Sequence, residues 1–282
     1  MKFGLMFANA GPFAFPEMMT HLATTAESNG FESIWTVEHV AIPVGYQSEY
    51  PYDPSGKIPA PENVPMPDPL LSLPYVAAVT KTLKLATGIL ILPQRHPLYV
   101  AKEVATLDVL SHGRAILGIG VGWLAEEFQA LGIPFAERGG RTAEAVKAVR
   151  SLWKEESEPF HGKYFNWNRL ESNPKPVQKP GVPIVVGGHT ELAARRAARY
   201  GDGFFPGRGD LPTLTKLLEV MREECRTLGR DPATIEVTAG AYTSDPDVLQ
   251  RMRDLGVQRV ITMPPAFDPQ GLTDGAKRYA DE

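Results

Sequence analysis

The chain has 282 residues, of which 43% are hydrophobic and 22% are charged, and its formal net charge is −4. This length suits one large domain or two ordinary ones, and the apolar fraction is ample for a buried core. The slight negative charge argues against a general role in binding nucleic acid or a membrane surface. The lone cysteine, Cys225, cannot form an internal disulfide, which is consistent with a reducing cytoplasm.

The start of the chain and its apolar runs predict where the protein works. The N-terminal sequence begins a strand-like run at once, without the basic segment, apolar core and small-residue cleavage site of a signal peptide. The apolar runs stay well short of the roughly 20 residues that a membrane-spanning helix requires. We therefore expect a cytoplasmic protein whose partners are small molecules, and neither nucleic acids nor membranes.

The first half of the chain alternates strand-like and helix-like segments. In chain order these are a strand at Lys2–Ala8, a helix that opens at Phe15-Pro16-Glu17 and ends at Ser28-Asn29-Gly30, a strand at Ser33–His39, a helix at Leu70–Thr80, a strand at Leu83–Leu92, a helix at Leu98–Leu110 and a strand at Ala115–Val121. The strands are short and apolar on both faces, which is typical of a covered parallel sheet.

A long proline-rich segment, Val40–Asp68, interrupts this alternation after the second strand. It has no hydrophobic period and carries Tyr46, Tyr50 and Tyr52. Loops of this length in compact domains are usually lids or disordered segments. The aromatic residues and prolines favour an ordered lid over a substrate, and an oligomer contact is the alternative.

The second half of the chain continues the same pattern. In order it holds a helix at Glu137–Glu155, a hairpin with a proline-rich tail at Glu158–Gln178, a strand at Val182–Val186, a helix at Thr190–Tyr200, a strand at Gly203–Pro206, a helix at Leu211–Leu228 with Asp210 as N-cap, a strand at Ile235–Tyr242, a helix at Pro246–Leu255, a strand at Arg259–Pro264 and a short last helix from Leu272.

Eight strand signals, most of them followed by helices, favour an α/β fold of the (β/α)8 TIM-barrel type. A doubly wound sheet would have about five or six strands and an early glycine fingerprint, and the first turn here, "ANAGPF", lacks that fingerprint. We predict a single TIM-barrel domain over residues 1–282. It carries a long loop after the second strand and a hairpin insertion before the fifth.

Polar residues and glycines follow five of the predicted strands. They are Glu38-His39, Gln94-Arg95-His96, Gly120-Val121-Gly122-Trp123, Gly187-Gly188-His189-Thr190 and Gly207-Arg208. Active sites of such barrels lie at the C-terminal ends of the strands, so we expect these clusters on one rim. The turn Ser111–Arg114 falls on the opposite face, where His112 and Arg114 are expected to be turn and barrel-floor residues.

His39 is the candidate catalytic residue of this rim. The pKa of a histidine lies near neutrality, so the imidazole can give or take a proton during redox chemistry. Neighbouring strand residues face opposite sides, so only one of Glu38 and His39 can face the barrel mouth, and we favour His39. The alternative is a structural histidine whose hydrogen bonds are satisfied in the core.

The glycine-rich turns suggest a bound ring and a phosphate. The glycines of "GIGVGW" would let a flat ring lie against the backbone, and "GGHT" ahead of a helix offers free N–H groups and a hydroxyl to phosphate. Tight βα turns are the alternative for both. The histidines lack the spacing of a metal site such as H-E-x-x-H, so no metal is expected.

Several long stretches carry a joint pattern, among them "WTVEHV", "TGILILPQRHPLYVAKEVATLDVLSHGR", "LGIGVGWLAEEFQALGIPFAERGGRTAEAVKAVRSLW" and "PIVVGGHT". Together they resemble the bacterial luciferase-like monooxygenase superfamily, and most of all its branch that uses the deazaflavin coenzyme F420. The resemblance covers nearly the whole chain. It implies a TIM barrel with the flavin or deazaflavin at its C-terminal mouth.

The resemblance also implies roles for individual residues. His39 matches the family histidine close to the reactive face of the ring, and Gly88-Ile89 matches a bulge that often contains a non-proline cis peptide behind the ring. The implied cofactor contacts are Thr87, Gly88, Ile89, Gly120, Gly122, Trp123, Gly187, Gly188, His189, Thr190 and Arg208.

One departure from the family pattern concerns the choice of cofactor. The light-emitting luciferases have an arginine on the turn after strand four that helps to hold the FMN phosphate, and this sequence has Val121 there. Such a departure weakens an FMN-binding hypothesis, and Arg95 or Arg208 would have to supply the charge instead.

The resemblance implies an F420-dependent oxidoreductase that moves a hydride between the deazaflavin C5 and an unknown small organic substrate, with His39 as proton donor or acceptor. The alternative is an FMN-dependent monooxygenase that uses O₂ and reduced flavin from a separate reductase. A non-catalytic flavin-binding homologue is a third possibility. Family members are often dimers, so we expect a homodimer.

Overall fold

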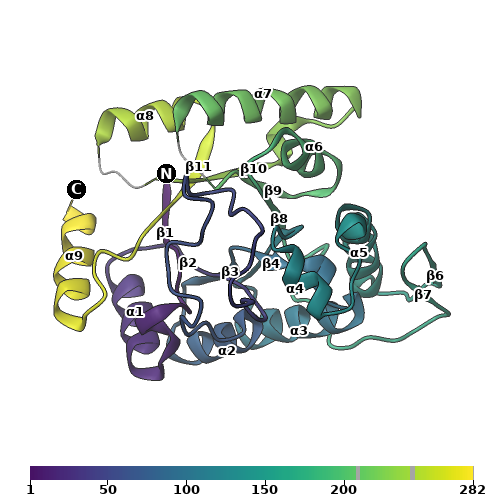
Figure 1. The fold of residues 1–282 in the computed structure, drawn as a ribbon, viewed down its shortest axis with the longest axis horizontal. Helices are drawn as coiled ribbons and strands as arrows, with labels where there is room; N and C mark the ends of the chain where they lie inside the picture. The colour runs from purple at the N-terminus through teal and green to yellow at the C-terminus, as the bar shows by residue number, and fades with distance from the viewer. Residues whose placement is uncertain (208–209, 242–244, 282) are drawn as a thin grey trace.

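The computed structural model describes residues 1–207, 210–241 and 245–281, and its central feature is a ring of parallel strands (Figure 1). These strands are β1 (Lys2–Leu5), β2 (Ser33–Thr36), β3 (Lys84–Thr87), β5 (Ala115–Gly120), β8 (Ile184–Gly187), β9 (Gly203–Phe205), β10 (Glu236–Gly240) and β11 (Val257–Thr262). They are hydrogen-bonded in the order β3-β2-β1-β11-β10-β9-β8-β5, and β5 pairs again with β3. The predicted (β/α)8 barrel is confirmed.

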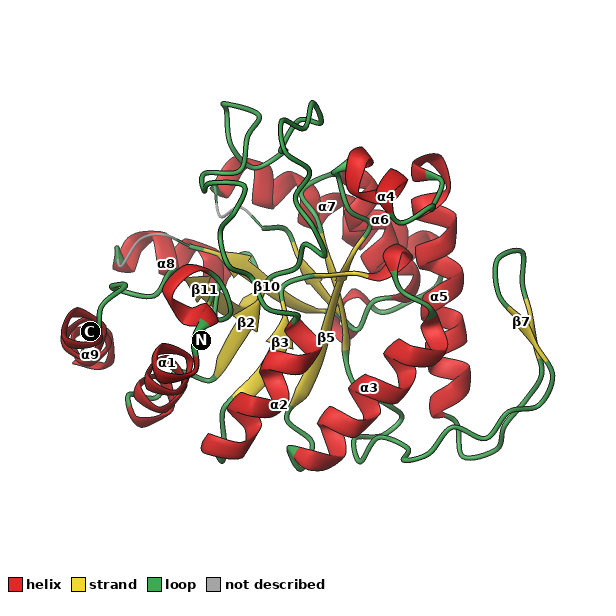
Figure 2. Ribbon diagram, turned by 60° about the horizontal axis from the view of Figure 1, so that its bottom comes forward, coloured by secondary structure: helices red, strands yellow, loops and turns green. Residues whose placement is uncertain are grey.

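Helices surround this barrel on the outside (Figure 2). They are α1 (Pro16–Ser28), α2 (Pro69–Val79), α3 (Pro97–Leu110), α4 (Ala125–Ala130), α5 (Arg138–Trp153), α6 (Glu191–Tyr200), α7 (Leu211–Thr227), α8 (Pro246–Asp254) and α9 (Pro269–Asp281). Short 3-10 turns add η1 (Gly11–Ala14), η2 (Leu92–Gln94), η3 (Phe135–Glu137) and η4 (Pro232–Thr234). In the part of the chain that the structure describes, no helix combines the length and apolar character that a bilayer crossing demands.

Side-chain caps explain where several helices begin. Asp210 accepts a hydrogen bond from the backbone N–H of Thr213 at 3.1 Å, which confirms the predicted N-cap of α7. Asp68 caps α2 in the same way. Prolines occupy the first turn of both helices, where a backbone N–H would have no intrahelical acceptor, so its absence costs no hydrogen bond.

The third strand is broken, where the sequence predicts one continuous strand over Leu83–Leu92. β3 ends at Thr87, and the chain resumes as β4 (Leu90–Ile91), which pairs with the far end of β5. The peptide bond between Gly88 and Ile89 is cis, as the family resemblance implies. The break lies at the C-terminal end of the barrel and turns residues 88–91 toward its mouth.

The lower part of the barrel is a packed core. Trp35 from β2 and Phe205 from β9 meet edge to face inside it, with ring centroids 5.3 Å apart. Arg114 closes the floor by donating hydrogen bonds to the Leu83 and Ala77 carbonyl groups, as predicted for that face. Near the start of β11, the Arg259 guanidinium packs against the face of the Trp35 ring and pairs with Glu32 and Glu236. The mouth is therefore the part of the barrel that can take a ligand.

The expected hairpin insertion is present between α5 and β8. It consists of the antiparallel strands β6 (Phe160–His161) and β7 (Asn166–Trp167), and it stands apart at one side of the barrel (Figure 2). The long loop after β2, residues 40–68, is ordered around Tyr46. The Tyr46 hydroxyl oxygen accepts a hydrogen bond from the Ile58 N–H at 2.9 Å, and the side chain is buried. We call this segment the lid loop.

Candidate active site

A cavity of about 590 Å³ opens at the C-terminal mouth of the barrel. Most of the residues that the sequence predicts as site residues line it, and they come from the ends of four strands. These residues are His39, Gly88, Ile89, Gly120, Gly122, Trp123, Gly187, Gly188, His189 and Thr190. Residues from four of the five strand-end clusters predicted for the rim, including Gly207, therefore line one cavity.

One predicted cofactor contact, Thr87, is not part of this wall. The Thr87 side chain is buried behind it, where its hydroxyl donates a hydrogen bond to the Gly118 carbonyl oxygen at 2.6 Å. Thr87 therefore supports the barrel strands at this point. Arg208 lies outside the residues that the structure describes.

His39 is held at the wall by a buried carboxylate. Its Nδ1 lies 3.0 Å from Oε2 of Glu127, a residue of α4 that sequence reasoning missed. The Glu127 side chain is 1% exposed and also accepts hydrogen bonds from Gln94 and from the Ala41 N–H. Burial raises the pKa of Glu127, but the His39 and Gln94 contacts outweigh it and leave the pKa below its ordinary value. A carboxylate at this position accepts a hydrogen bond from Nδ1–H, so that Nε2 is the nitrogen that can exchange a proton with a ligand.

The lid loop packs onto Trp123, next to His39. The Trp123 ring lies edge-on to His39 at 5.7 Å, to Tyr46 at 5.6 Å and to Tyr50 at 5.2 Å between centroids. Glu126 of α4 holds residues 47 and 48 of the loop, because its carboxylate accepts hydrogen bonds from their backbone N–H groups. Two adjacent carboxylates of α4, those of Glu126 and Glu127, therefore secure the loop and His39.

The Ile89 side chain packs against the strand-end glycines on which the sequence analysis places a flat ring. A Cβ atom on Gly120 would lie 2.5 Å from Cδ1 of Ile89, and one on Gly187 would collide with Cγ2 of the same side chain. A Cβ on Gly122 would approach Phe128 at 2.7 Å and Ile91 at 2.8 Å. The glycines therefore make room for residues 88–91, which we call the shelf. The shelf and the strand-end glycines line the cavity together at this point.

One end of the cavity is cationic. Gly188 has a φ of 135°, a conformation that glycine tolerates, and it precedes Thr190, the N-cap of α6. Arg138 and Arg196 also line this end. Within the described residues neither has an ion-pair partner, and the Arg138 Nε is buried without a hydrogen bond. Burial and then the charge of Arg196 lower the pKa of Arg138, as expected for neighbouring cations.

Sequence reasoning missed these two arginines. They lie on α5 and α6, inside helical sequences in which arginine is common, and their proximity arises only from the fold. Two guanidinium groups beside a helix N-terminus suit a phosphate or carboxylate group.

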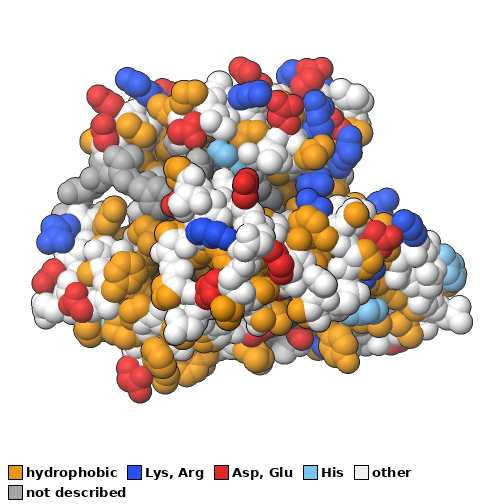
Figure 3. Space-filling view, viewed as in Figure 1, with side chains coloured by type: hydrophobic (Ala, Val, Ile, Leu, Met, Phe, Trp, Pro, Cys, Tyr) orange, Lys and Arg blue, Asp and Glu red, His pale blue; other side chains and the backbone are white. Residues whose placement is uncertain are grey.

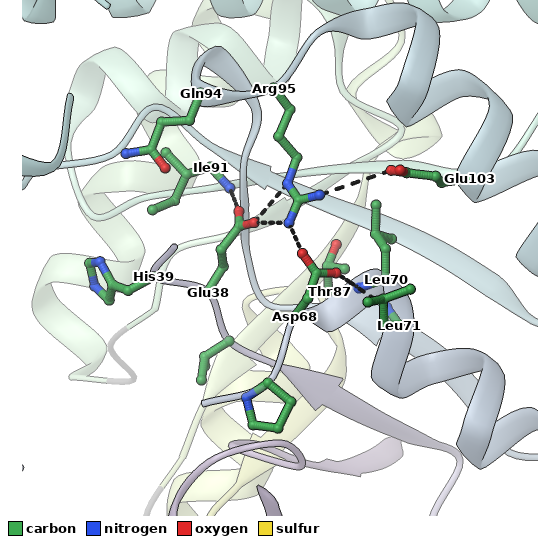
Figure 4. Close-up of polar contacts among 12 residues, drawn as sticks. Glu38, His39, Asp68, Leu70, Leu71, Thr87, Ile91, Gln94, Arg95 and Glu103 are labelled. Carbon is green, nitrogen blue, oxygen red and sulfur yellow. Dashed lines mark hydrogen bonds and ion pairs between the residues drawn. The ribbon is translucent and has the colours of Figure 1, made fainter. Parts of the chain in front are cut away.

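Arg95 does not supply charge to the cavity, which corrects the sequence-based expectation. It lies behind the wall and binds the carboxylates of Glu38 and Asp68 (Figure 4). The Glu38 carboxylate points toward Arg95 and away from the His39 ring, although both residues contribute to the cavity lining. His96 is also away from the cavity, where it accepts from the Leu98 N–H and packs on Phe165.

Comparison with known proteins relates the chain to redox enzymes. A model of the luciferase-like monooxygenase family matches residues 2–255. The chain is 33% identical over 272 residues to the Rv0940c protein of Mycobacterium tuberculosis, covering 91% of this chain and 93% of that protein. It is 35% identical to an F420-dependent glucose-6-phosphate dehydrogenase of Kineococcus radiotolerans, covering 82% of this chain and 64% of that enzyme.

An FMN-dependent enzyme is also similar. The chain is 27% identical to an FMNH₂-dependent dimethylsulfone monooxygenase of Pseudomonas putida, covering 82% of this chain and 59% of that enzyme. Among solved structures, an F420-dependent secondary alcohol dehydrogenase in complex with an F420–acetone adduct superposes with a TM-score of 0.78 at 20% identity. That match covers 100% of this chain and 99% of the other, and it shows likeness of fold.

Proposed function

Because the chain belongs to the luciferase-like monooxygenase family, we propose that it is a cytoplasmic oxidoreductase that uses coenzyme F420. Its relatives include enzymes that depend on F420 and on FMN, which supports a flavin-type cofactor. The reaction is hydride transfer between the deazaflavin C5 and a carbon of a small organic substrate. The observation that carries the proposal is the position of His39, at the cavity wall on a buried carboxylate.

The residues of the cavity fit a ring system that carries a phosphate. The shelf offers an apolar surface at Ile89, and the cationic end offers Arg138, Arg196 and the start of α6. The buried Arg138 Nε is a donor without a partner among the described residues, and an anionic oxygen would satisfy it. We assign the ring to the shelf and the phosphate to the cationic end.

The chain itself supplies proton transfer and exclusion of water. When bound, the cofactor supplies the carbon that gives or takes the hydride. His39 gives or takes the coupled proton at Nε2, because Nδ1 is engaged by Glu127. The hydrogen bond to the Glu127 carboxylate fixes the plane of the His39 ring. Tyr50 and Tyr52 of the lid loop line the cavity and exclude water from the reacting groups.

The choice of F420 rests on Val121, which stands where the luciferases carry a phosphate-binding arginine. One observation favours FMN as the alternative, since Arg138 and Arg196 supply positive charge at the same cavity. In that case the protein is a monooxygenase that receives reduced flavin from a separate reductase and consumes O₂.

A binding titration with the two oxidised cofactors separates these functions. We expect tighter binding of F420 than of FMN, followed by the change in fluorescence of the bound ligand. Tighter binding of FMN, with oxygen consumption that depends on a substrate, would establish the monooxygenase instead.

We also propose that the protein is a homodimer. Leu71, Tyr75 and Val79 recur every four residues on α2, so they share one face of that helix. Leu71 is 76% exposed and Tyr75 43%. Figure 3 shows hydrophobic side chains along the lower edge of the molecule, where Figure 1 places α2. A second copy would remove this apolar face from water.

A further inference from the structure

Four charged side chains meet behind the cavity wall (Figure 4). Arg95 follows η2, and its Nε and Nη2 donate to Oε1 of Glu38 at 2.7 and 2.5 Å. The same Nη2 binds Asp68, and Nη1 lies 3.9 Å from Glu103. The Arg95 side chain is 17% exposed and that of Glu38 2%, so the pair at the centre of the network is largely out of water, while Asp68 and Glu103 are partly exposed.

The network joins three segments that build the site. Glu38 precedes His39 on the chain, and its second oxygen accepts the Ile91 N–H at the end of the shelf. Asp68 is the last residue of the lid loop. Its other carboxylate oxygen caps α2 through the Leu70 N–H at 2.8 Å. One guanidinium therefore links the shelf, the lid loop and the strand end that carries His39.

We propose that Arg95 is a positioning residue that holds the shelf and the end of the lid loop in register with His39. The inference rests on the proposed function, because that function places the reacting groups of cofactor and substrate between the shelf and His39. A guanidinium is suited to this task because its planar fork binds two carboxylates in fixed directions. A lysine would keep the charge but present one point of contact.

The charges around Arg95 explain why the register depends on it. Glu38, Asp68 and Glu103 all face this single cation. Burial raises the pKa of Glu38 and the charge of Arg95 opposes that increase. Without the guanidinium, Glu38 would take up a proton or turn toward water. Either change weakens its hydrogen bond to the Ile91 N–H and frees the shelf.

The chain offers a matched control for a general role in stability. Arg259 is also a buried arginine that bridges two carboxylates, those of Glu32 and Glu236. It lies at the barrel floor and is not among the residues that line the cavity. Arg95→Lys and Arg259→Lys therefore remove the same kind of fork from opposite ends of the barrel.

The first test is hydrogen–deuterium exchange on the cofactor-free protein. Arg95→Lys is expected to speed exchange about tenfold in peptides covering residues 60–71 and 86–92, because a single ammonium group cannot hold both carboxylates in fixed directions. Arg259→Lys should leave both segments at the wild-type rate. Unchanged exchange in Arg95→Lys, or an equal effect of Arg259→Lys on these segments, would overturn the inference.

The second test measures turnover and cofactor binding separately. With F420 and a panel of alcohols and aldehydes as substrates, Arg95→Lys should lower kcat by about 100-fold, because the shelf and His39 are no longer held in register. Its dissociation constant for F420 should change far less, because the cationic end is untouched. Wild-type kcat in Arg95→Lys would refute the positioning role. If the wild-type protein binds neither F420 nor FMN, the proposed function fails while the exchange test still decides the network.

A third variant keeps the test decisive if Arg95→Lys does not fold. Asp68→Asn retains a side chain that can cap α2 and removes only the ion pair with Arg95. Faster exchange confined to the end of the lid loop would support the inference. Wild-type exchange there would overturn the part assigned to the lid loop.

Discussion

His39 is the side chain whose loss should separate chemistry from binding. We predict that His39→Ala lowers turnover by about 100- to 10,000-fold, because a positioned proton donor is lost. Cofactor affinity should change little, since the cationic end of the cavity is intact. Steady-state kinetics and a fluorescence titration measure the two effects. His161→Ala, which removes an exposed histidine of the hairpin, is the control. Equal turnover in His39→Ala would remove His39 from the mechanism.

Arg196 should determine how tightly the phosphate is held. We predict that Arg196→Gln weakens binding of FMN about 10- to 100-fold, the effect of losing one charge-assisted hydrogen bond. Binding of riboflavin, which lacks the phosphate, should be unaffected. The neighbouring Arg195 pairs with Glu224, so Arg195→Gln is the control. Parallel losses for both ligands would show that Arg196 does not act on the phosphate.

The sequence allowed His39 to be selected because it follows an apolar strand at the predicted rim, and the structure places it on the cavity wall. The sequence pattern did not identify Glu127 or Arg196 as site residues. Both lie on helices, and they approach the site only when α4 and α6 pack onto the barrel. Their roles depend on contacts between distant segments, which local patterns do not encode.

Elements were predictable where one physical signal dominated. Apolar runs marked the strands, and Asp210 marked the start of α7. The hydrophobic pattern did not mark the break between β3 and β4, which only the family resemblance implied, because residues 88–92 continue the strand signal with no polar residue before Pro93. α4 was missed because its six residues are too short to show a helical period. Both omissions lie at the candidate site.

The contact of Ile89 with the strand-end glycines should be measurable as an energetic coupling. We predict that Gly187→Ala destabilises the protein by about 1–3 kcal/mol, because its Cβ would collide with Ile89. In an Ile89→Ala background the same change should cost less. A double-mutant cycle of urea unfolding measures the coupling. Strictly additive effects would mean that Gly187 is required for another reason.

At the scale of the whole molecule, the barrel could be predicted because eight short apolar strands with intervening helices leave few alternative architectures. Closure itself is a long-range event. It depends on the pairing of β1 with β11, the first and last strands of the barrel, which no local pattern connects. The sequence therefore predicted the architecture but not the registers that bring the rim residues together.

The exposed face of α2 should control oligomeric state. We predict that the wild-type protein is a dimer and that Leu71→Glu is a monomer, because a charge on this face cannot be buried without a partner. Size-exclusion chromatography with light scattering measures the mass. Leu228→Glu, a change at an exposed leucine that directly follows α7, should leave the dimer intact. A monomeric wild-type protein would refute this face as an interface.

The neighbouring carboxylates of α4 have a consequence for protein engineering. Glu126 holds residues 47 and 48 of the lid loop, and Glu127 holds His39 and the Ala41 N–H, so the short helix after β5 serves both the loop and the histidine. Residues 40–68 are therefore not an exchangeable module. A chimera that takes this loop from a relative with another substrate would need to carry residues 125–130 with it. Transplanting the loop alone would leave its anchor mismatched and would disturb the histidine beside it.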